Sequence, residues 1–346
     1  MKAVISIEHP AWAWQFCNII NRMNNSKDDD IMILAVDKDG DLDLLKSFGI
    51  DYYLMANSTG KNVVEKAALF IVLSLKYTYK VMKYKPDVII GRASPMLAIA
   101  SFLTRTPQVI FEDTEISKFS LNICKRVAKK IITPTFFLAD LGKTQVRLPM
   151  YKELFYLHEE LFTPDKEVLK CTNIDIMQPY VLIRFISWNA SHDFGRHGLN
   201  DMDKIRFVEQ IAKEINVYIS SEGKIPKELE KYRLIAPFDK IHHVLYFATL
   251  VVSEGTTTAS EAAVLGTHAV YLNKNHGTTL EQERKYKLLI AVNNQKTKYK
   301  DALNVINNMI KNQGTWMEGK EKRKYLLQEM PNPNNVYYEY MEMYSK

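Results

Sequence analysis

The sequence predicts an α/β protein made of two doubly wound parallel-sheet domains that face each other across a cleft. Short β-branched strand patterns alternate with helix-length patterns, which is typical of parallel sheets covered by helices on both faces. The alternation stops over residues 148–179 and then resumes. A chain of 346 residues is also large for one hydrophobic core and ordinary for two.

The first domain is expected over residues 1–150. Its strand patterns lie at 2–7, 31–36, 87–91, 108–112 and 130–133, with helix patterns at 11–24, 41–48, 61–84 and 94–103. The following segment, 151–178, contains no clear strand and carries Pro164 near its middle. We therefore expect it to be a linker.

The second domain is expected over residues 179–333. Its strand patterns lie at 180–185, 216–221, 232–236, 249–254 and 268–273, with helix patterns at 201–214, 239–248 and 257–265. The C-terminal segment 334–346 is aromatic and has a helical pattern, so we expect it to pack on another part of the chain.

The composition limits the class of protein. Hydrophobic residues make up 47% of the chain and charged residues 25%, as in a soluble globular protein. The longest apolar run, 67–75, is too short to span a bilayer, and the first residues show no secretory signal pattern. Three widely spaced cysteines, Cys17, Cys124 and Cys171, argue against a disulfide framework and against zinc. We therefore expect a cytoplasmic location.

The formal net charge is +6, and part of the excess lies in segment 118–131. Its basic residues, Lys118, Lys125, Arg126, Lys129 and Lys130, alternate with apolar ones. Such a segment can lie on the inner face of an anionic membrane. The simpler interpretation is a helix with one face in solvent and the other in the core. No nucleic-acid-binding motif accompanies the charge, so no nucleic-acid partner is expected.

Polar residues follow several strands of the first domain, and ligands of open parallel sheets bind at such strand ends. His9 follows strand 2–7 and is either a general base or a helix cap. Arg92 follows strand 87–91 and could meet a phosphate. Glu112, Asp113 and Glu115 crowd together after strand 108–112. Crowded carboxylates raise at least one pKa and suit acid–base chemistry, although an acidic helix cap also explains them.

The loop after strand 180–185 is long and polar. It carries or adjoins Arg184, Ser187, Asn189, Ser191, His192, Asp193, Arg196 and His197. So many hydrogen-bonding groups at one strand end suit a polyhydroxylated, anionic ligand better than a packing role.

The segment SEGTTTASE, residues 253–261, joins a buried strand to a short alanine-rich helix. Glycine lets the backbone approach a ligand closely, and unpaired N–H groups at a helix start suit a phosphate. The candidate ligand-binding residues are Ser253, Gly255, Thr256, Thr257, Thr258 and Glu261. Thr258 and Glu261 also match a capping box, in which Glu261 bonds to its own helix start. Both interpretations of Glu261 stay open.

Motifs for other chemistries are missing from the sequence. Neither the dinucleotide fingerprint G-x-G-x-x-G nor the phosphate-binding G-x-x-x-x-G-K-[ST] occurs, which disfavours hydride transfer and P-loop phosphoryl transfer. His242 and His243 are adjacent and lack the i, i+4 spacing of helical zinc ligands. No metal site is expected.

The segments EHPAWAWQF, RFISWNASHDFG, SSEGKIPKELEKY and DKIHHVLYFATLVVSEGTTTASEAAVLGT together resemble an archaeal and bacterial family, the domain of unknown function 354. That family is similar in turn to two-domain nucleotide-sugar enzymes of GT-B fold. These include the lipid II-forming N-acetylglucosaminyltransferase and the UDP-N-acetylglucosamine 2-epimerases. The resemblance implies a GT-B-like fold of two Rossmann-like domains and a nucleoside-diphosphate sugar, of the UDP-sugar kind, as substrate. It implies no prosthetic group and no metal.

The resemblance also implies roles for individual residues. The backbone at 255–258 would hold the diphosphate, Glu261 would accept hydrogen bonds from the ribose hydroxyls, and residues 235–238 would lie against the base. His9 matches the position at which inverting GT-B transferases often keep a general base, and Arg184 or Arg196 would stabilise the leaving diphosphate. The C-terminal helix at 334–346 would cross back onto the first domain.

The leading hypothesis is a glycosyltransferase of cell-surface glycan synthesis that uses a glycan or lipid-linked acceptor. One alternative is a sugar-nucleotide epimerase, in which Glu112, Asp113, Glu115 and His192 move protons. Another is a nucleotide-sugar-binding protein without catalysis. One departure concerns the transferases: the glycine-rich loop of the lipid II enzyme is replaced here by Glu-His-Pro-Ala at 8–11.

Overall fold

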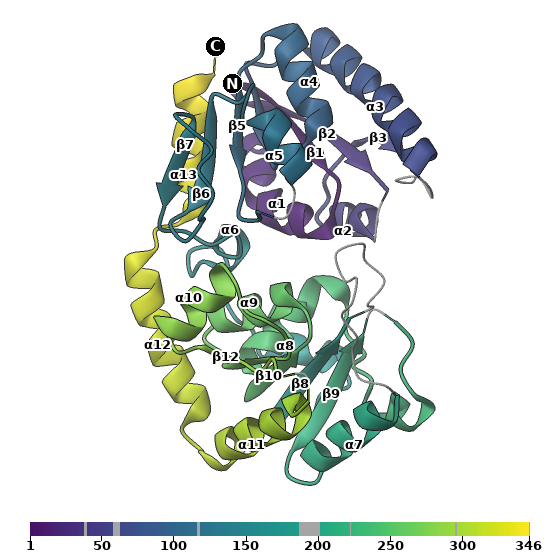
Figure 1. Ribbon diagram of the computed structural model, residues 1–346, viewed down its shortest axis with the longest axis vertical. Coiled ribbons are helices and arrows are strands. Elements are labelled where there is room, and N and C mark those ends of the chain that lie inside the picture. The colour runs from purple at the N-terminus through teal and green to yellow at the C-terminus, as the bar shows by residue number, and fades with distance from the viewer. Residues whose placement is uncertain are drawn as a thin grey trace. The chain divides into compact units, whose positions relative to one another are not determined.

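The computed structural model describes residues 1–37, 40–57, 63–115, 118–186, 201–221, 223–294 and 296–345. The chain forms two compact units (Figure 1). The first contains residues 1–161 and 330–346, and the second contains residues 162–329. The division falls inside segment 151–178, and the residues on each side of it pack into their own unit.

The first unit is built on a sheet of seven parallel strands in the order β3-β2-β1-β4-β5-β6-β7. Their bounds are β1 (Lys2–Ile7), β2 (Asp30–Val36), β3 (Tyr53–Ala56), β4 (Val88–Gly91), β5 (Gln108–Phe111), β6 (Lys130–Pro134) and β7 (Gln145–Leu148). The strand order runs outward from β1 in both directions. The winding therefore reverses between β1 and β4, and this is the place where ligands of such sheets bind.

Helices cover both faces of this sheet, so its central strands are buried along nearly their whole length (Figure 1). The helices are α1 (Pro10–Asn24), α2 (Asp41–Ser47), α3 (Val63–Tyr84), α4 (Pro95–Thr104), α5 (Lys118–Cys124), α6 (Leu154–Leu157) and α13 (Pro333–Tyr344). Proline occupies the first turn of α1 and α4, where its missing N–H costs nothing. In α4 the Ser94 hydroxyl also accepts from the Leu97 N–H.

The second unit has a sheet of five parallel strands in the order β12-β11-β10-β8-β9. Their bounds are β8 (Tyr180–Phe185), β9 (Asn216–Ser221), β10 (Leu250–Ser253), β11 (Ala269–Tyr271) and β12 (Leu289–Ala291). The winding of this sheet reverses between β8 and β10. The ends of these two strands are therefore the expected ligand position of the second unit.

The second unit is completed by helices on its two faces. They are α7 (Asp201–Ala212), α8 (Ile241–Phe247), α9 (Thr256–Val264), α10 (Thr278–Arg284), α11 (Lys298–Lys311) and α12 (Thr315–Glu329), with 3-10 helices η1 (Glu167–Cys171), η2 (Lys227–Tyr232) and η3 (Phe238–Lys240). Helix α9 is fixed at its C-terminal end by Lys320 of α12, whose Nζ donates to the Leu265 carbonyl at 3.0 Å.

The fold class is confirmed, because both sheets are parallel and both alternate with helices. The strand expected at 232–236 is wrong. The segment pairs with β9 only through an isolated bridge between Arg233 and Ile219. The Asn173 side chain bonds its other backbone groups: Nδ2 donates to the Arg233 carbonyl and Oδ1 accepts from the Ile235 N–H, each at 2.8 Å. Three strands were not predicted, namely β3, β7 and β12, and each is the last strand at one edge of its sheet.

The basic segment 118–131 is not one helix. Helix α5 ends at Cys124, and β6 begins at Lys130. Several apolar residues of this segment, namely Leu121, Cys124, Ala128 and Ile131, are buried in one core cluster, whereas Phe119 is 65% exposed. The buried residues fit the simpler interpretation, with one side of the segment in the core and basic residues such as Arg126 in solvent.

Helix α13 packs on the sheet of the first unit through Tyr337, which is fully buried. Its hydroxyl donates to the Val109 carbonyl at 2.8 Å and accepts from the Gly91 N–H at 3.0 Å. One side chain of the C-terminal helix thus satisfies backbone groups of both β4 and β5.

We expect Tyr337→Phe to lower the free energy of unfolding by about 1–3 kcal/mol, because the buried Gly91 N–H and Val109 carbonyl lose their hydrogen bonds to the hydroxyl. Urea unfolding measures the change. Tyr340→Phe on the same helix is the control, since Tyr340 is only partly buried. Equal effects of the two substitutions would show that the Tyr337 hydroxyl contributes nothing.

Candidate functional site

The turn between β10 and α9 lies at the reversal of winding in the second sheet. Gly255 is the N-cap of α9 and has an extended backbone (φ −94°, ψ 138°). A Cβ atom at this position would lie 2.9 Å from Cγ2 of Ile186, the residue that follows β8. Only glycine lets the turn pass so close to the end of the neighbouring strand.

The hydrogen bonds of this turn leave the start of α9 open. The Ser253 hydroxyl donates to the Gly255 carbonyl at 2.8 Å and accepts from the Gly255 N–H at 3.1 Å, and the hydroxyls of Thr256 and Tyr271 are 2.7 Å apart. Within the described residues, no protein acceptor meets the N–H groups of residues 256–258, which are partly exposed. An open helix start of this kind attracts anions.

Glu261 lies one turn further along α9 and is 7% exposed. Its Oε1 is 3.2 Å from Nε2 of His242, a buried residue of α8. The capping-box interpretation is wrong, because α9 begins at Thr256 and is capped by Gly255, so Thr258 already lies inside the first turn. Glu261 shares one face of α9 with Thr257 and Thr258, its i−4 and i−3 neighbours.

Other candidates of the second unit surround this turn. Arg184 of β8 is in register with Ser253 of β10, and its Nη1 donates to the Ser220 hydroxyl at 2.7 Å. Glu254 was not predicted: it is fully buried and accepts from the Ile186 N–H at 3.2 Å. In the sequence, only its position between the end of a predicted strand and Gly255 indicated that Glu254 could belong to the site. Ser187 and His192, with the rest of loop 187–200, lie outside the described residues.

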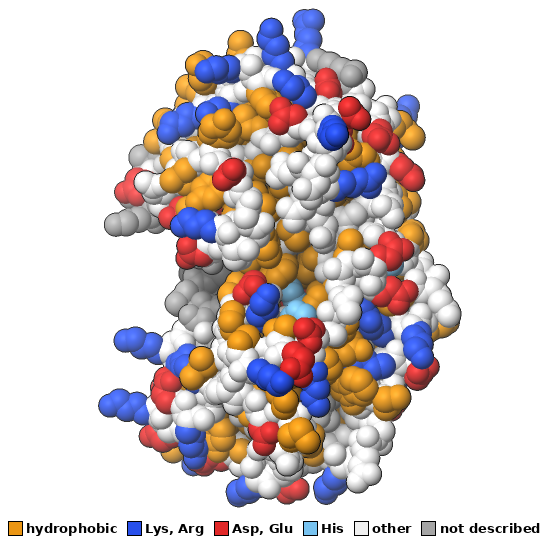
Figure 2. All heavy atoms as spheres, turned by 180° about the vertical axis from the view of Figure 1, so that it is seen from behind, with side chains coloured by type: hydrophobic (Ala, Val, Ile, Leu, Met, Phe, Trp, Pro, Cys, Tyr) orange, Lys and Arg blue, Asp and Glu red, His pale blue; other side chains and the backbone are white. Residues whose placement is uncertain are grey.

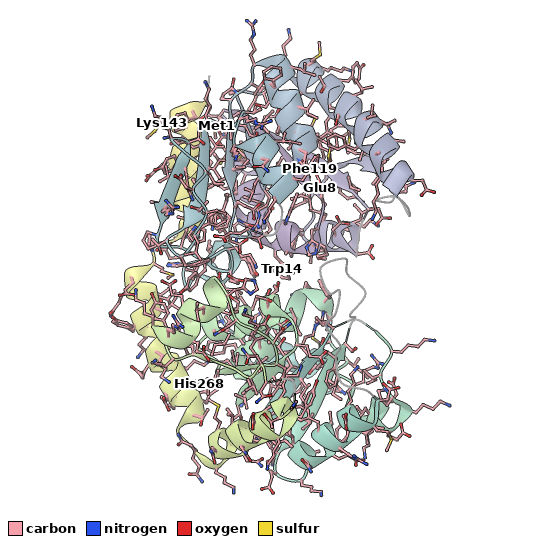
Figure 3. The ribbon with its side chains drawn as sticks, in the orientation of Figure 1. Met1, Glu8, Trp14, Phe119, Lys143 and His268 are labelled. Carbon is pink, nitrogen blue, oxygen red and sulfur yellow. The ribbon has the colours of Figure 1, made fainter. Side chains whose placement is uncertain are left out.

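In the first unit, the turns after β1 and β4 meet through Glu8 (Figure 3). Its Oε1 accepts from the Ser6 hydroxyl at 2.9 Å and from the Ser94 hydroxyl at 2.8 Å. The Glu8 carboxylate is therefore held at the reversal of winding in the first sheet. The sequence offered only its place in the turn as a signal.

His9 is the N-cap of α1, and its Nδ1 accepts from the Ala11 N–H at 3.1 Å. A backbone N–H only donates, so the neutral ring carries its proton on Nε2. In this conformation the exposed nitrogen is a hydrogen-bond donor. Of the two interpretations of His9, the geometry favours the cap over the general base.

Arg92 forms a buried ion-pair network with the acidic loop after β5. Its guanidinium contacts Glu112, lies 2.5 Å from Asp113 Oδ1 and donates to Gln15 Oε1 at 3.1 Å. Lys152 Nζ is 3.3 Å from Asp113 Oδ2. Two of the crowded carboxylates predicted from the sequence, Glu112 and Asp113, are therefore paired with cations.

Opposing effects set the pKa values of this network. Burial raises the pKa of Asp113, but the charges of Arg92 and Lys152 outweigh it and lower that pKa to about 2. Burial raises the pKa of Glu112 above its ordinary value despite the nearby guanidinium. Glu115 plays a separate role, since it accepts from the N–H groups of Leu138 and Ala139. The acidic-cap interpretation is thus wrong for both Asp113 and Glu115.

Among the described residues, no group of three or more His, Cys, Asp or Glu side chains is arranged to hold a metal ion. Each unit thus has its own candidate region: in the second unit an open helix start with the buried Glu261 carboxylate, and in the first unit the Glu8 carboxylate and the Arg92 ion-pair network.

Two Rossmann-like units with their open turns at the points of reversed winding define a GT-B-like fold, and known structures bear this out. The UDP-GlcNAc 2-epimerase from Neisseria meningitidis bound to UDP-GlcNAc is similar with a TM-score of 0.71 and 13% identity, covering 99% of each chain. The epimerase from Methanocaldococcus jannaschii has a TM-score of 0.65 and 13% identity, covering 94% of this chain and 98% of its own. Glycosyltransferase VinC in complex with dTDP has a TM-score of 0.65 and 10% identity, covering 99% of both.

A family model described as "Protein of unknown function (DUF354)" matches residues 1–345. The chain belongs to this family. No curated protein matches the sequence.

We expect Arg92→Met to destabilise the protein by about 3–5 kcal/mol at pH 7, because it leaves the buried Glu112 without its cation and Asp113 with Lys152 alone. The stabilisation from Asp113 is present above its ordinary pKa of about 3.9 and is lost as the pH falls towards its folded value of about 2. In the variant the buried carboxyls take up protons more readily. The loss should therefore be smaller at pH 4 than at pH 7.

Urea unfolding at both pH values measures this difference. Arg126→Met is the matched control, since Arg126 is exposed. If the variant does not fold at pH 7, recovery of cooperative unfolding at pH 4 supports the same account. A loss that does not change with pH would contradict it.

Proposed function

We propose that the protein is a nucleotide-sugar-dependent glycosyltransferase of GT-B type that binds its donor at the start of α9. The single observation that carries the proposal is the open helix start at residues 256–258, at the reversal of winding in the second sheet. Its N–H groups and the helix dipole suit the diphosphate of a nucleoside-diphosphate sugar.

The buried Glu261 supports a nucleotide over other anions. Thr257 and Thr258 lie on the same face of α9 as Glu261. When the N–H groups of these threonines bind the diphosphate, the group attached to that diphosphate therefore lies beside the Glu261 carboxylate. In a nucleoside diphosphate that group is the ribose, whose hydroxyls donate to carboxylates. His242, 3.2 Å away, fixes the position of the carboxylate. We assign loop 235–238 to the base, as the family resemblance implies.

The ligands of the similar structures agree with this class of donor. The Neisseria meningitidis epimerase binds UDP-GlcNAc, and VinC binds dTDP. By analogy we propose a UDP-sugar as the donor and a glycan or lipid-linked hydroxyl as the acceptor, in the synthesis of a cell-surface glycan in the cytoplasm.

In the proposed reaction the acceptor oxygen forms a bond to the anomeric carbon of the sugar. The bond from that carbon to the diphosphate oxygen breaks, and its electron pair leaves with the diphosphate. The start of α9 and Arg184 would stabilise the leaving group. We assign the acceptor proton to Glu8 and not to His9, because the Ser6 and Ser94 hydroxyls orient the Glu8 carboxylate, whereas the exposed His9 nitrogen already carries a proton.

The ion-pair network favours transfer over epimerisation. An epimerase must remove and return a proton at a sugar carbon, and the candidates for this step were His192, Glu115 and the adjacent pair Glu112 and Asp113. Both are buried and paired with Arg92, and Asp113 also contacts Lys152. The charges of Arg92 and Lys152 lower the pKa of Asp113 to about 2, so that carboxylate is a weak base.

We expect Glu261→Gln to weaken UDP binding about 10- to 100-fold, because hydrogen bonds to a charged acceptor are worth about 1.5–3 kcal/mol. Isothermal titration with UDP measures the loss. His242→Gln should keep most of the affinity, since the Gln amide nitrogen can replace Nε2, whereas His242→Leu should lose it.

Glu209→Gln on the exposed face of α7 is the control for the change of charge. If Glu261→Gln lowered the melting temperature but left UDP affinity unchanged, Glu261 would be a structural residue, and the proposed nucleotide position would fail.

We expect Glu8→Gln to lower turnover of the cognate UDP-sugar at least about 100-fold, within the range for loss of a general base, with UDP affinity unchanged. Release of UDP in the presence of an acceptor panel measures turnover. His9→Asn should keep both turnover and melting temperature, because asparagine is a good N-cap.

A loss of turnover in His9→Asn at unchanged melting temperature would show that His9, and not Glu8, is the general base. The same assay run in deuterium oxide separates the two reactions. Deuterium at the sugar C2 position together with an epimeric product would contradict the transferase assignment.

A further inference from the structure

Helix α3 of the first unit is apolar on two sides. Its inner side is buried through residues that include Leu73, Tyr77 and Val81. On its outer side five large apolar residues face solvent, with Ile71, Leu75 and Tyr79 at least 61% exposed; the others are Val72 and Met82. We call these five residues the outer stripe. A helix that needs only to cover a sheet has one apolar side, and contiguous exposed apolar surface marks an interaction site.

The outer stripe forms one continuous surface. At about 100° per residue its five side chains fall within an arc of roughly 100°. Lys83, Lys76 and Lys80 come next around the helix, on one flank of that arc. An exposed apolar stripe bordered by lysines is typical of helices that lie in the plane of a membrane interface.

Neighbouring elements extend this surface. Lys80 Nζ lies 3.8 Å from the ring centre of Tyr53 on the edge strand β3, where Tyr53 and Leu54 are exposed. On the reverse of the first unit, hydrophobic and basic side chains lie mixed in the upper left of Figure 2.

The charge of α3 identifies the kind of partner. The helix carries four lysines and one carboxylate, Glu65. A second copy of this chain would bring the same lysines against one another, so self-association is disfavoured. An anionic lipid surface complements both the lysines and the outer stripe, because its phosphates pair with the lysines and its acyl boundary accepts the apolar side chains.

We propose that the outer stripe of α3 docks the protein on an anionic lipid bilayer. The helix lies along the interface: none of the helices in the described part of the chain is both long and apolar enough to cross a membrane. The basic segment 118–131 adds charge, but apolar residues such as Leu121 and Cys124 are committed to the core. The apolar contact therefore belongs to α3.

Co-sedimentation with vesicles tests the proposal on the full chain. The wild type should bind vesicles of 70% phosphatidylcholine and 30% phosphatidylglycerol, bind pure phosphatidylcholine more weakly, and dissociate as salt is raised. The double variant Ile71→Ser, Leu75→Ser should lower partitioning at least about 100-fold, since burying each side chain contributes about 1.5–3 kcal/mol. The triple variant Lys76→Gln, Lys80→Gln, Lys83→Gln should lower it on the order of 100-fold, because each lysine contributes about 1 kcal/mol.

Leu138→Ser is the matched control, because Leu138 is an exposed apolar residue of the same unit outside the stripe. The wild type failing to bind anionic vesicles, or the double variant binding as well as the wild type, would overturn the proposal. Oligomers in lipid-free solution that the double variant abolishes would also overturn it, in favour of a second copy. Unchanged melting temperatures show that the variants remain folded.

Discussion

Both units depend on one geometric constraint: in a parallel sheet, every loop that follows a strand emerges at the same edge. Where the winding reverses, two such loops have no crossover helix between them, and distant segments meet. Glu8 and Ser94 meet in this way in the first unit, 86 positions apart in the sequence. Ile186 and Gly255 meet in the second, so tightly that no side chain fits at Gly255. These two places hold the side chains and amide groups on which the proposed function rests.

The two places differ in how they treat charge. In the first unit, Arg92 and Lys152 neutralise Glu112 and Asp113 inside the protein, so the network is closed and its acids are satisfied. In the second unit, positive potential comes from backbone N–H groups at the start of α9, which are accessible and need no counter-ion within the described residues. A helix start with accessible N–H donors suits an anionic ligand that binds and dissociates. A buried network whose charges are paired suits a structural role, here in the turns after β4 and β5.

The sequence was most informative where burial dictates composition. Central strands such as β1 and β10 are buried on both faces, so their apolar runs identify them. Edge strands carry a weaker pattern: three of the four, β3, β7 and β12, were missed, whereas the six-residue edge strand β9 was predicted. The β10–α9 turn was recognised from its glycine and threonines. The sequence alone could not decide whether Glu261 caps its own helix or binds a ligand, because both interpretations fit the same residues. They separate only when α9 is seen to start at Thr256 and when His242, on another helix, is found beside the carboxylate.

The same limit separates the basic segment 118–131 from α3 as the proposed site of membrane contact. Residues 118–131 are basic, but docking on lipid needs apolar side chains that the fold leaves uncovered, and exposure is a property of packing. In α3 the inner and outer apolar residues follow one another along the chain, so the helix resembles an ordinary buried helix in sequence. The cover of α4 and the sheet on one side of the helix separates Leu73 and Tyr77, which are buried, from Ile71 and Leu75, which are exposed. The flanking lysines then disfavour self-pairing of this surface and favour an anionic partner.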